Sequence, residues 1–236
     1  MEKIYERARE HLMPNRRQFA ADPFGYGVSA SQRWALVRTL AGFPVDAESP
    51  GNSEELKAPV LWLAHARALS EAAAAVVRHE PAYDPLPDQF KGACDSQYCA
   101  VALMLVGYSL ETCLKAMLIL GKGVGTYSRE ELSHRHHRLD ELAAIVPDLG
   151  PKDSAILRNL THFVTWAGRY PDPGSGREGK LDDVFRSAEE HQMTLRDVFE
   201  LAARVMRHAT SIAEASGEEA TAAQHAAAAD GVARRR

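Results

Sequence analysis

The feature that most constrains the fold is a long apolar segment, AVALMLVGYSLETCLKAMLIL, which spans Ala100–Leu120. This segment is long enough to cross a membrane as a helix. Glu111 and Lys115 lie near its middle, however, and each charge costs roughly 2.5–3.5 kcal/mol at the centre of a bilayer. The two residues stand four apart with the acid first, which is the favourable order for an ion pair on a helix. We therefore predict a buried core helix and no contact with a membrane.

Composition and charge exclude several classes of protein. The chain has 236 residues, 45% of them hydrophobic, so it can bury a core of its own. Its net charge of −4 and pI of about 6.2 provide no general attraction to nucleic acid, so RNA binding would need a local basic patch. The three cysteines lack the spacing of a zinc site or a disulfide framework. The start, MEKIYERAREHLM, has no apolar region of a secretory signal. We expect a cytoplasmic protein without metal or cofactor.

Helical periodicity dominates the chain, and no run alternates with the period of a strand. We predict an all-α fold: an up-and-down bundle of four or five helices, with a helical arm before it and a tail after it. The arm and its linker take residues 1–53, with helices at Glu2–Met13 and Ser31–Leu40. The bundle takes residues 54–216. The low-complexity tail, residues 217–236, is expected to be disordered.

Start and stop signals divide the bundle into helices. Pro59 suits the first turn of the first helix, and Asp95 or Ser96 is expected to cap the second. Thr194 and Asp197 have the spacing of a capping box. The later helices are expected at Leu139–Val146, Pro151–Gly168 and Leu195–Ala215.

The helix predicted from Pro151 carries an arginine and a histidine one turn apart, in the stretch RNLTHFVTWAGRYPDP. At about 100° per residue, its apolar residues gather on one side and its polar residues almost opposite. The polar stripe consists of Arg158, His162, Thr165 and Arg169. Such a stripe either faces a ligand or partner, or is the solvated side that every amphipathic surface helix has. The angular pattern alone favours the second interpretation.

Four motifs resemble those of the HEPN family, the higher eukaryote and prokaryote nucleotide-binding domains. They are GYSLETCLKAMLI, HHRLDELA, RNLTHF and RYP. The most specific motif is Glu111-x-x-x-Lys115. A second is His137-x-Leu139, and a third is Arg169-Tyr170-Pro171, which is similar to the RYP sequence found in a subset of family members. The resemblance covers residues 54–215. It implies an all-α bundle that is commonly dimeric, and often a metal-independent ribonuclease of toxin–antitoxin, CRISPR-associated or phage-defence systems.

The resemblance also implies catalytic residues. The nuclease members carry an arginine, usually followed by asparagine, and then a histidine after four to six residues. Here three residues separate Arg158 from His162, one fewer than in that pattern, and Asn159 follows the arginine. Arg158 would hold a phosphate, His162 would transfer a proton, Asn159 would orient either of them, and Glu111 would position Arg158. An intrahelical ion pair with Lys115 is the alternative role of Glu111.

Further residues are candidates for contact with RNA or with a partner. Trp166 and Tyr170 offer aromatic rings on which bases can stack, although Trp166 lies close enough to the apolar side to be core. The HRHHR turn carries a cluster of basic residues that would attract phosphate: Arg135, His137 and Arg138, to which the stripe adds Arg169. A solvated basic turn is the alternative for this cluster, and we predict no metal site.

Two classes of function remain open from the sequence. One is an RNA-directed homodimer, possessing or lacking nuclease activity. The other is an inactive scaffold whose polar stripe serves dimerisation or binds a protein such as an antitoxin. The short Arg–His spacing and the acidic pI favour the scaffold. The placement of Arg158 and Asn159 and the facing of His162 favour RNA, and we predict the RNA-directed protein with the scaffold as the alternative.

Overall fold

The computed structural model describes residues 11–40 and 55–233, and all regular elements within them are helices. The prediction of an all-α fold is confirmed for this part of the chain. The chain divides into two compact units, Met1–Lys57 and Ala58–Arg236. The first unit takes in the predicted arm, residues 1–53, and the first four residues of the predicted bundle, and the second unit takes in the rest of that bundle.

The described residues of the first unit form three short helices, α2 (Arg16–Ala21), α3 (Pro23–Val28) and α4 (Ala30–Leu40), and the 3₁₀ turn η1 (Glu55–Lys57). Side-chain caps define the first two. Asn15 accepts a hydrogen bond from the backbone N–H of Gln18, and Asp22 accepts one from that of Gly25. Helix α4 corresponds to the helix predicted at Ser31–Leu40. The helix predicted at Glu2–Met13 lies mostly outside the described residues, as does most of the predicted linker.

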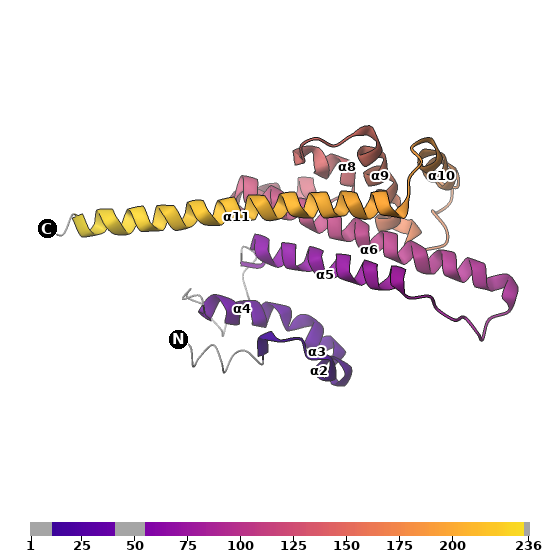
Figure 1. The fold of residues 1–236 in the computed structure, drawn as a ribbon, viewed down its shortest axis with the longest axis horizontal. Coiled ribbons are helices and arrows are strands. Elements are labelled where there is room, and N and C mark those ends of the chain that lie inside the picture. Colours follow the sequence, from indigo (N-terminus) through magenta and orange to yellow (C-terminus); the bar gives the residue numbers. More distant parts are fainter. Residues whose placement is uncertain (1–10, 41–54, 234–236) are drawn as a thin grey trace. The chain divides into compact units, whose positions relative to one another are not determined.

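Three long helices build the second unit (Figure 1). Helices α5 (Pro59–Arg78) and α6 (Asp88–Lys122) form a hairpin, and α11 (Leu195–Ala233) also packs on α6. The hydroxyl of Ser109 on α6 donates to the Ala66 carbonyl of α5 at 2.8 Å, which joins the hairpin at a buried point. Pro59 occupies the first turn of α5, as predicted.

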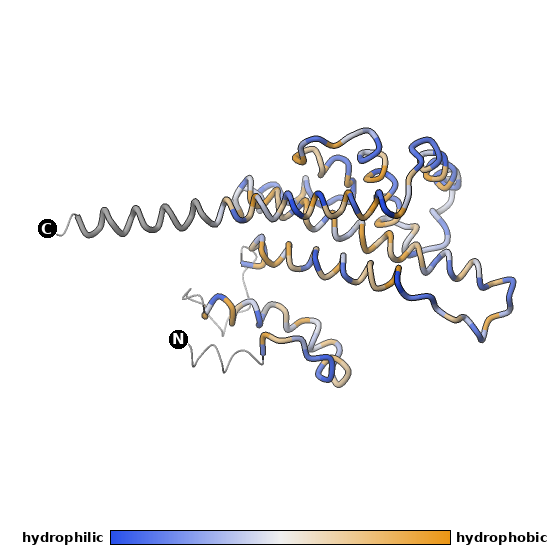
Figure 2. The backbone as a smooth tube through the Cα atoms, viewed as in Figure 1, coloured by the Kyte–Doolittle hydropathy of each residue, from blue (hydrophilic) through white to orange (hydrophobic). Residues whose placement is uncertain are grey.

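Helix α6 provides the centre of the core, as predicted for Ala100–Leu120. Its apolar residues pack against the inner faces of α5, α9 and α11 and form one cluster. Figure 2 shows the apolar residues along these helices. The fully buried large side chains of this cluster include Leu110, Leu114, Ile119, Ile156, Leu157, Leu201 and Val205.

By length and composition alone, two of the described helices, α5 and α6, could cross a membrane. Buried core helices pass the same test. Most of the apolar stretch of α6 is covered by other helices of its own unit, and its charged residues are paired there.

Shorter elements complete the second unit. They are α7 (Val124–Glu130), η2 (Glu131–His134), α8 (Leu139–Leu142), η3 (Ala143–Ile145), α9 (Pro151–His162), the π-helical turn η4 (Phe163–Ala167) and α10 (Lys180–Glu190). Two glycines allow α9 and η4 to approach α6 closely. A methyl group at Gly107 would collide with Val164, and one at Gly168 would collide with Met104.

Helix boundaries differ from prediction in two long helices. Helix α6 begins at Asp88 and not at Asp95 or Ser96. The Ser96 hydroxyl bonds back to the Gly92 carbonyl at 2.9 Å, so it lies within the helix and caps nothing. Helix α11 continues to Ala233, where a disordered tail was expected from residue 217. Alanine has the highest helix propensity of all residues, which explains the continuation.

The start of α11 agrees with prediction. The Thr194 backbone N–H donates to Asp197 Oδ2 at 2.8 Å, and the Asp197 N–H donates to Thr194 Oγ1 at 3.3 Å, which is a capping box. Lys152 Nζ lies 2.7 Å from the same Asp197 oxygen. The hydrogen bond from Lys152, with those from Thr194, lowers the pKa of Asp197 to about 2.

Candidate functional site

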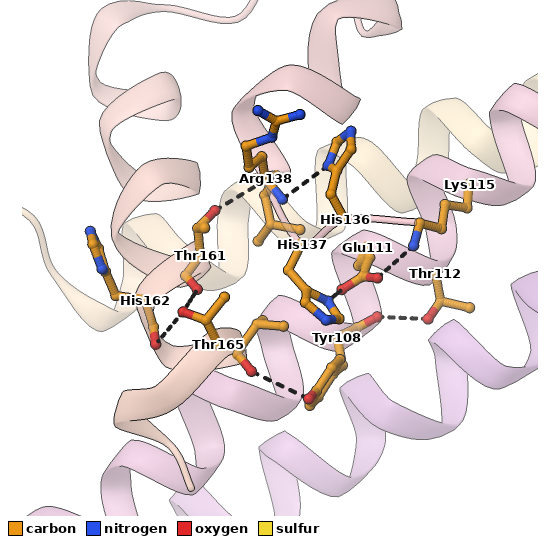
Figure 3. A network of polar contacts seen from close by, with 12 residues as sticks. Tyr108, Glu111, Thr112, Lys115, His136, His137, Arg138, Thr161, His162 and Thr165 are labelled. Atoms are coloured by element: carbon orange, nitrogen blue, oxygen red, sulfur yellow. Dashed lines mark hydrogen bonds and ion pairs between the residues drawn. The ribbon is translucent and has the colours of Figure 1, made fainter. Parts of the chain in front are cut away.

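Glu111 is a buried carboxylate on α6 with a partner for each oxygen (Figure 3). Lys115 Nζ donates to Oε1 at 2.7 Å, and His137 Nδ1 lies 2.8 Å from Oε2. Glu111 is only 7% exposed and the Lys115 side chain 12%, so this pair is shielded from water, whereas the His137 side chain is 45% exposed. The intrahelical pair with Lys115 is therefore present, and His137 rather than Arg158 takes the second oxygen.

The Glu111–His137 pair sits beside the helix that carries His162. The His137 ring meets the Tyr108 ring edge-on at 6.2 Å, and the Tyr108 hydroxyl donates to the Val164 carbonyl at 3.3 Å. On the other side, the backbone N–H of Leu139 donates to Thr161 Oγ1 at 3.0 Å. These two hydrogen bonds hold the chain one residue before and two residues after His162.

Arg158 and Asn159 are neighbours on α9 with different surroundings. Arg158 is exposed, and it has no hydrogen-bond or ion-pair partner among the residues that the structure describes. The Asn159 amide nitrogen donates to the Val184 carbonyl at 3.2 Å and contacts Met193 Sδ at 3.6 Å. Asn159 thus joins α9 to α10. Its amide nitrogen makes these two contacts and none with His162.

His162 is half-buried at the end of α9, and its ring points away from the Glu111–His137 pair (Figure 3). Burial lowers the pKa of His162, and the positive charge of Lys180 lowers it further, against a smaller opposing effect of Asp183. The neutral imidazole is therefore favoured at pH 7. A neutral imidazole can accept a proton, which is what a general base must do.

The π-helical turn η4 changes the direction of the residues after His162. Gly168 N–H bonds to the Phe163 carbonyl at 3.1 Å, five residues back. Because such a turn takes more residues than an α-helical turn, the stripe predicted from a regular α-helix does not continue in phase to Arg169. Arg169 instead donates to the Thr165 carbonyl, and its guanidinium lies 5.5 Å from the centre of the Tyr170 ring.

The two aromatic candidates differ in exposure. Tyr170 is 56% exposed, so one face remains open beside Arg169. Trp166 is half-buried within η4. Tyr170 is thus the better placed of the two for stacking on a base.

Both arginines of the HRHHR turn are paired with acids. Arg135 lies 3.8 Å from Glu131, and Arg138 lies 3.0 Å from Glu141. His137 is bound to Glu111, as described above. Each arginine charge is thus offset by a nearby carboxylate, which weakens the predicted basic patch.

Helix α10 was not predicted, although it supplies the charges that face His162. A signal was present in the sequence: Leu181, Val184 and Ala188 recur at helical spacing, and Asp182 and Asp183 suit a first turn. The glycine- and proline-rich segment before α10 led to the prediction of a loop there.

No protein-family model, curated protein or solved structure matches this chain.

Proposed function

We propose that this protein is a HEPN-like, RNA-directed cytoplasmic protein that contacts RNA through Arg158 and His162 on α9. One observation carries the proposal. These two side chains lie one helical turn apart, and neither the guanidinium nor the imidazole has a polar partner in the described part of the chain. Unpaired groups of this kind are free to bind a phosphate without first losing another interaction.

The chemistry follows from the two groups. The Arg158 guanidinium donates to two phosphate oxygens of the RNA. The neutral His162 imidazole takes the proton of a ribose 2′-hydroxyl, whose oxygen attacks the adjacent phosphorus while the bond to the 5′-oxygen breaks. A protonated imidazole returns a proton to that leaving oxygen. This makes the protein a metal-independent endoribonuclease, of the kind used in bacterial toxin–antitoxin or phage-defence systems.

A second copy of the chain would supply the second imidazole. The described surface of α10, whose Lys180 and Asp183 act on His162, carries two exposed apolar residues, Leu181 (52%) and Phe185 (64%). Exposed apolar residues beside a polar site favour contact with another protein. We propose a homodimer that brings two copies of α9 together.

The test is incubation of the purified protein with labelled total RNA in EDTA. We expect cleavage that persists in the chelator and falls about 10²- to 10⁴-fold in His162→Ala, the range for loss of a general acid–base group. His208→Ala, a half-buried histidine on α11, is the matched control and should cleave normally. Intact RNA with the wild-type protein would contradict the nuclease activity.

The alternative is an inactive scaffold that binds a second copy or an antitoxin-like protein. Asn159 favours it, because its amide nitrogen is occupied by α10 and Met193. On this alternative, RNA neither binds nor is cleaved, while Phe185→Glu still abolishes dimerisation in analytical ultracentrifugation.

A further inference from the structure

An apolar pocket of about 260 Å³ opens in the second unit between α9, α10 and the beginning of α11. No charged side chain lines it. Its apolar walls come from four helices and the Met193 turn: Leu103, Ile156, Leu160, Phe163, Val184, Ala188, Met193, Leu195 and Val198. A concave and mostly apolar site with a few polar groups is the usual form of a small-molecule pocket.

Only two polar side chains line the pocket, Asn159 and Thr194. The Thr194 hydroxyl already donates to Asp197 at 2.7 Å and accepts from the Asp197 N–H. The Asn159 amide nitrogen uses its two donors on Val184 and Met193. The Asn159 carbonyl oxygen accepts no hydrogen bond from any described residue. Asn159 therefore has an unused acceptor oxygen on a side chain that lines an otherwise largely apolar pocket.

We propose that this pocket binds a flat, uncharged apolar molecule that carries a single N–H or O–H group, donated to Asn159 Oδ1. Dry apolar cavities of about 150 Å³ hold a benzene ring, so the larger volume here suits a fused pair of rings. A charged ligand would lose its hydration without gaining a partner, which excludes nucleotides and amino acids.

The ligand would touch the residues that hold α10 against α9. Asn159 and Phe163 flank Arg158 and His162 in the chain, and Val184 follows Asp183. The site is nevertheless separate from the proposed RNA contact, and the proposal does not depend on it.

The test is titration of the full chain with two probes of nearly equal shape, indole, which has one N–H donor, and indene, which has none. By calorimetry or ligand-observed NMR, we expect one saturable site for indole with a Kd below roughly 1 mM, well within the range for small apolar ligands. Indene should bind about fivefold to tenfold more weakly, since one hydrogen bond is lost. Equal affinity would overturn the role of Asn159, and no saturable binding of indole would overturn the site.

Filling the pocket provides a second test. Ala188→Phe should abolish indole binding, and Ala75→Phe, at an exposed position on α5, should leave it unchanged. If Ala188→Phe fails to fold, the two-probe titration of the wild-type protein decides the question. If neither probe binds and Ala188→Phe instead weakens self-association, a side chain of a second copy fills the pocket and the small-molecule proposal is overturned.

Discussion

Two parts of the second unit carry basic residues, and they differ in how those residues are paired. In the HRHHR turn, both arginines and one histidine lie beside acids: Arg135 beside Glu131, Arg138 beside Glu141, and His137 beside Glu111. On α9, Arg158 and His162 have no polar side-chain partner in the described chain. The turn contains more basic residues than α9, but both of its arginines have an acidic partner, whereas Arg158 on α9 has none among the described residues.

The number of basic residues in a segment therefore does not say how many of them lack an acidic partner. A paired cation must give up its acid before it can hold a phosphate, whereas an unpaired one loses only water. We therefore expect α9, and not the turn, to dominate contact with RNA.

The largest expected effect concerns the buried pair. Glu111→Ala leaves Lys115 and His137 without their shared partner, and loss of one member of a buried pair typically costs about 3 kcal/mol. Urea unfolding followed by circular dichroism measures this loss. Glu141→Ala, which breaks an exposed pair of the same turn, should cost less than about 0.5 kcal/mol. Equal losses in both variants would show that burial does not distinguish the two pairs.

The next prediction concerns Arg138 after the loss of its acidic partner. Glu141→Gln removes the acid that pairs with Arg138, so we expect RNA affinity to rise about twofold to fivefold at low salt. The slope of log affinity against log salt concentration should become steeper by about one unit, because one more counterion is released. Fluorescence anisotropy at several salt concentrations measures both. Glu214→Gln on α11 makes the same change of charge without freeing an arginine, and it should have a smaller effect. The same rise in both variants would indicate that net charge alone matters.

Much of this contrast was accessible from the sequence. Glu131 precedes Arg135 by four residues and Glu141 follows Arg138 by three, which are ion-pairing distances on a helix. No acid stands three or four residues from Arg158. The central helix and the capping box of α11 were also predictable, because local hydrophobicity and side-chain caps determine them.

The remaining features depend on contacts that sequence spacing does not report. The bond between His137 and Glu111 joins residues 26 positions apart, and that between Asn159 and Val184 joins residues 25 apart. The π-helical turn after His162 lies where Val164 and Gly168 pack closely on α6. A regular α-helix turns about 100° per residue, and the prediction based on it therefore assigned Arg169 wrongly to the same polar stripe as His162.

A smaller effect tests the surroundings of His162. Replacing Lys180 with methionine removes a positive charge that lowers the pKa of His162, so we expect this pKa to rise toward its ordinary value of about 6.5. NMR titration of the imidazole measures it, with Lys91→Met on α6 as the control.

The same lowered pKa sets the direction of a stability change. Below about pH 6.5 the unfolded chain takes up the His162 proton before the folded protein does, so stability falls as the pH drops through that window toward the folded pKa. Lys180→Met should make this loss smaller. An unchanged or lower pKa in Lys180→Met would show that Lys180 does not act on His162.

The most direct measurement compares two arginines of the same unit. RNA affinity is determined by fluorescence anisotropy for Arg158→Gln and Arg138→Gln, each with the same loss of charge. We predict a loss of about tenfold for Arg158→Gln, in line with one charged hydrogen-bonding group, and a change of less than about twofold for Arg138→Gln, whose arginine is already paired. Equal losses, or a larger loss for Arg138→Gln, would contradict the assignment of RNA contact to the unpaired residues of α9.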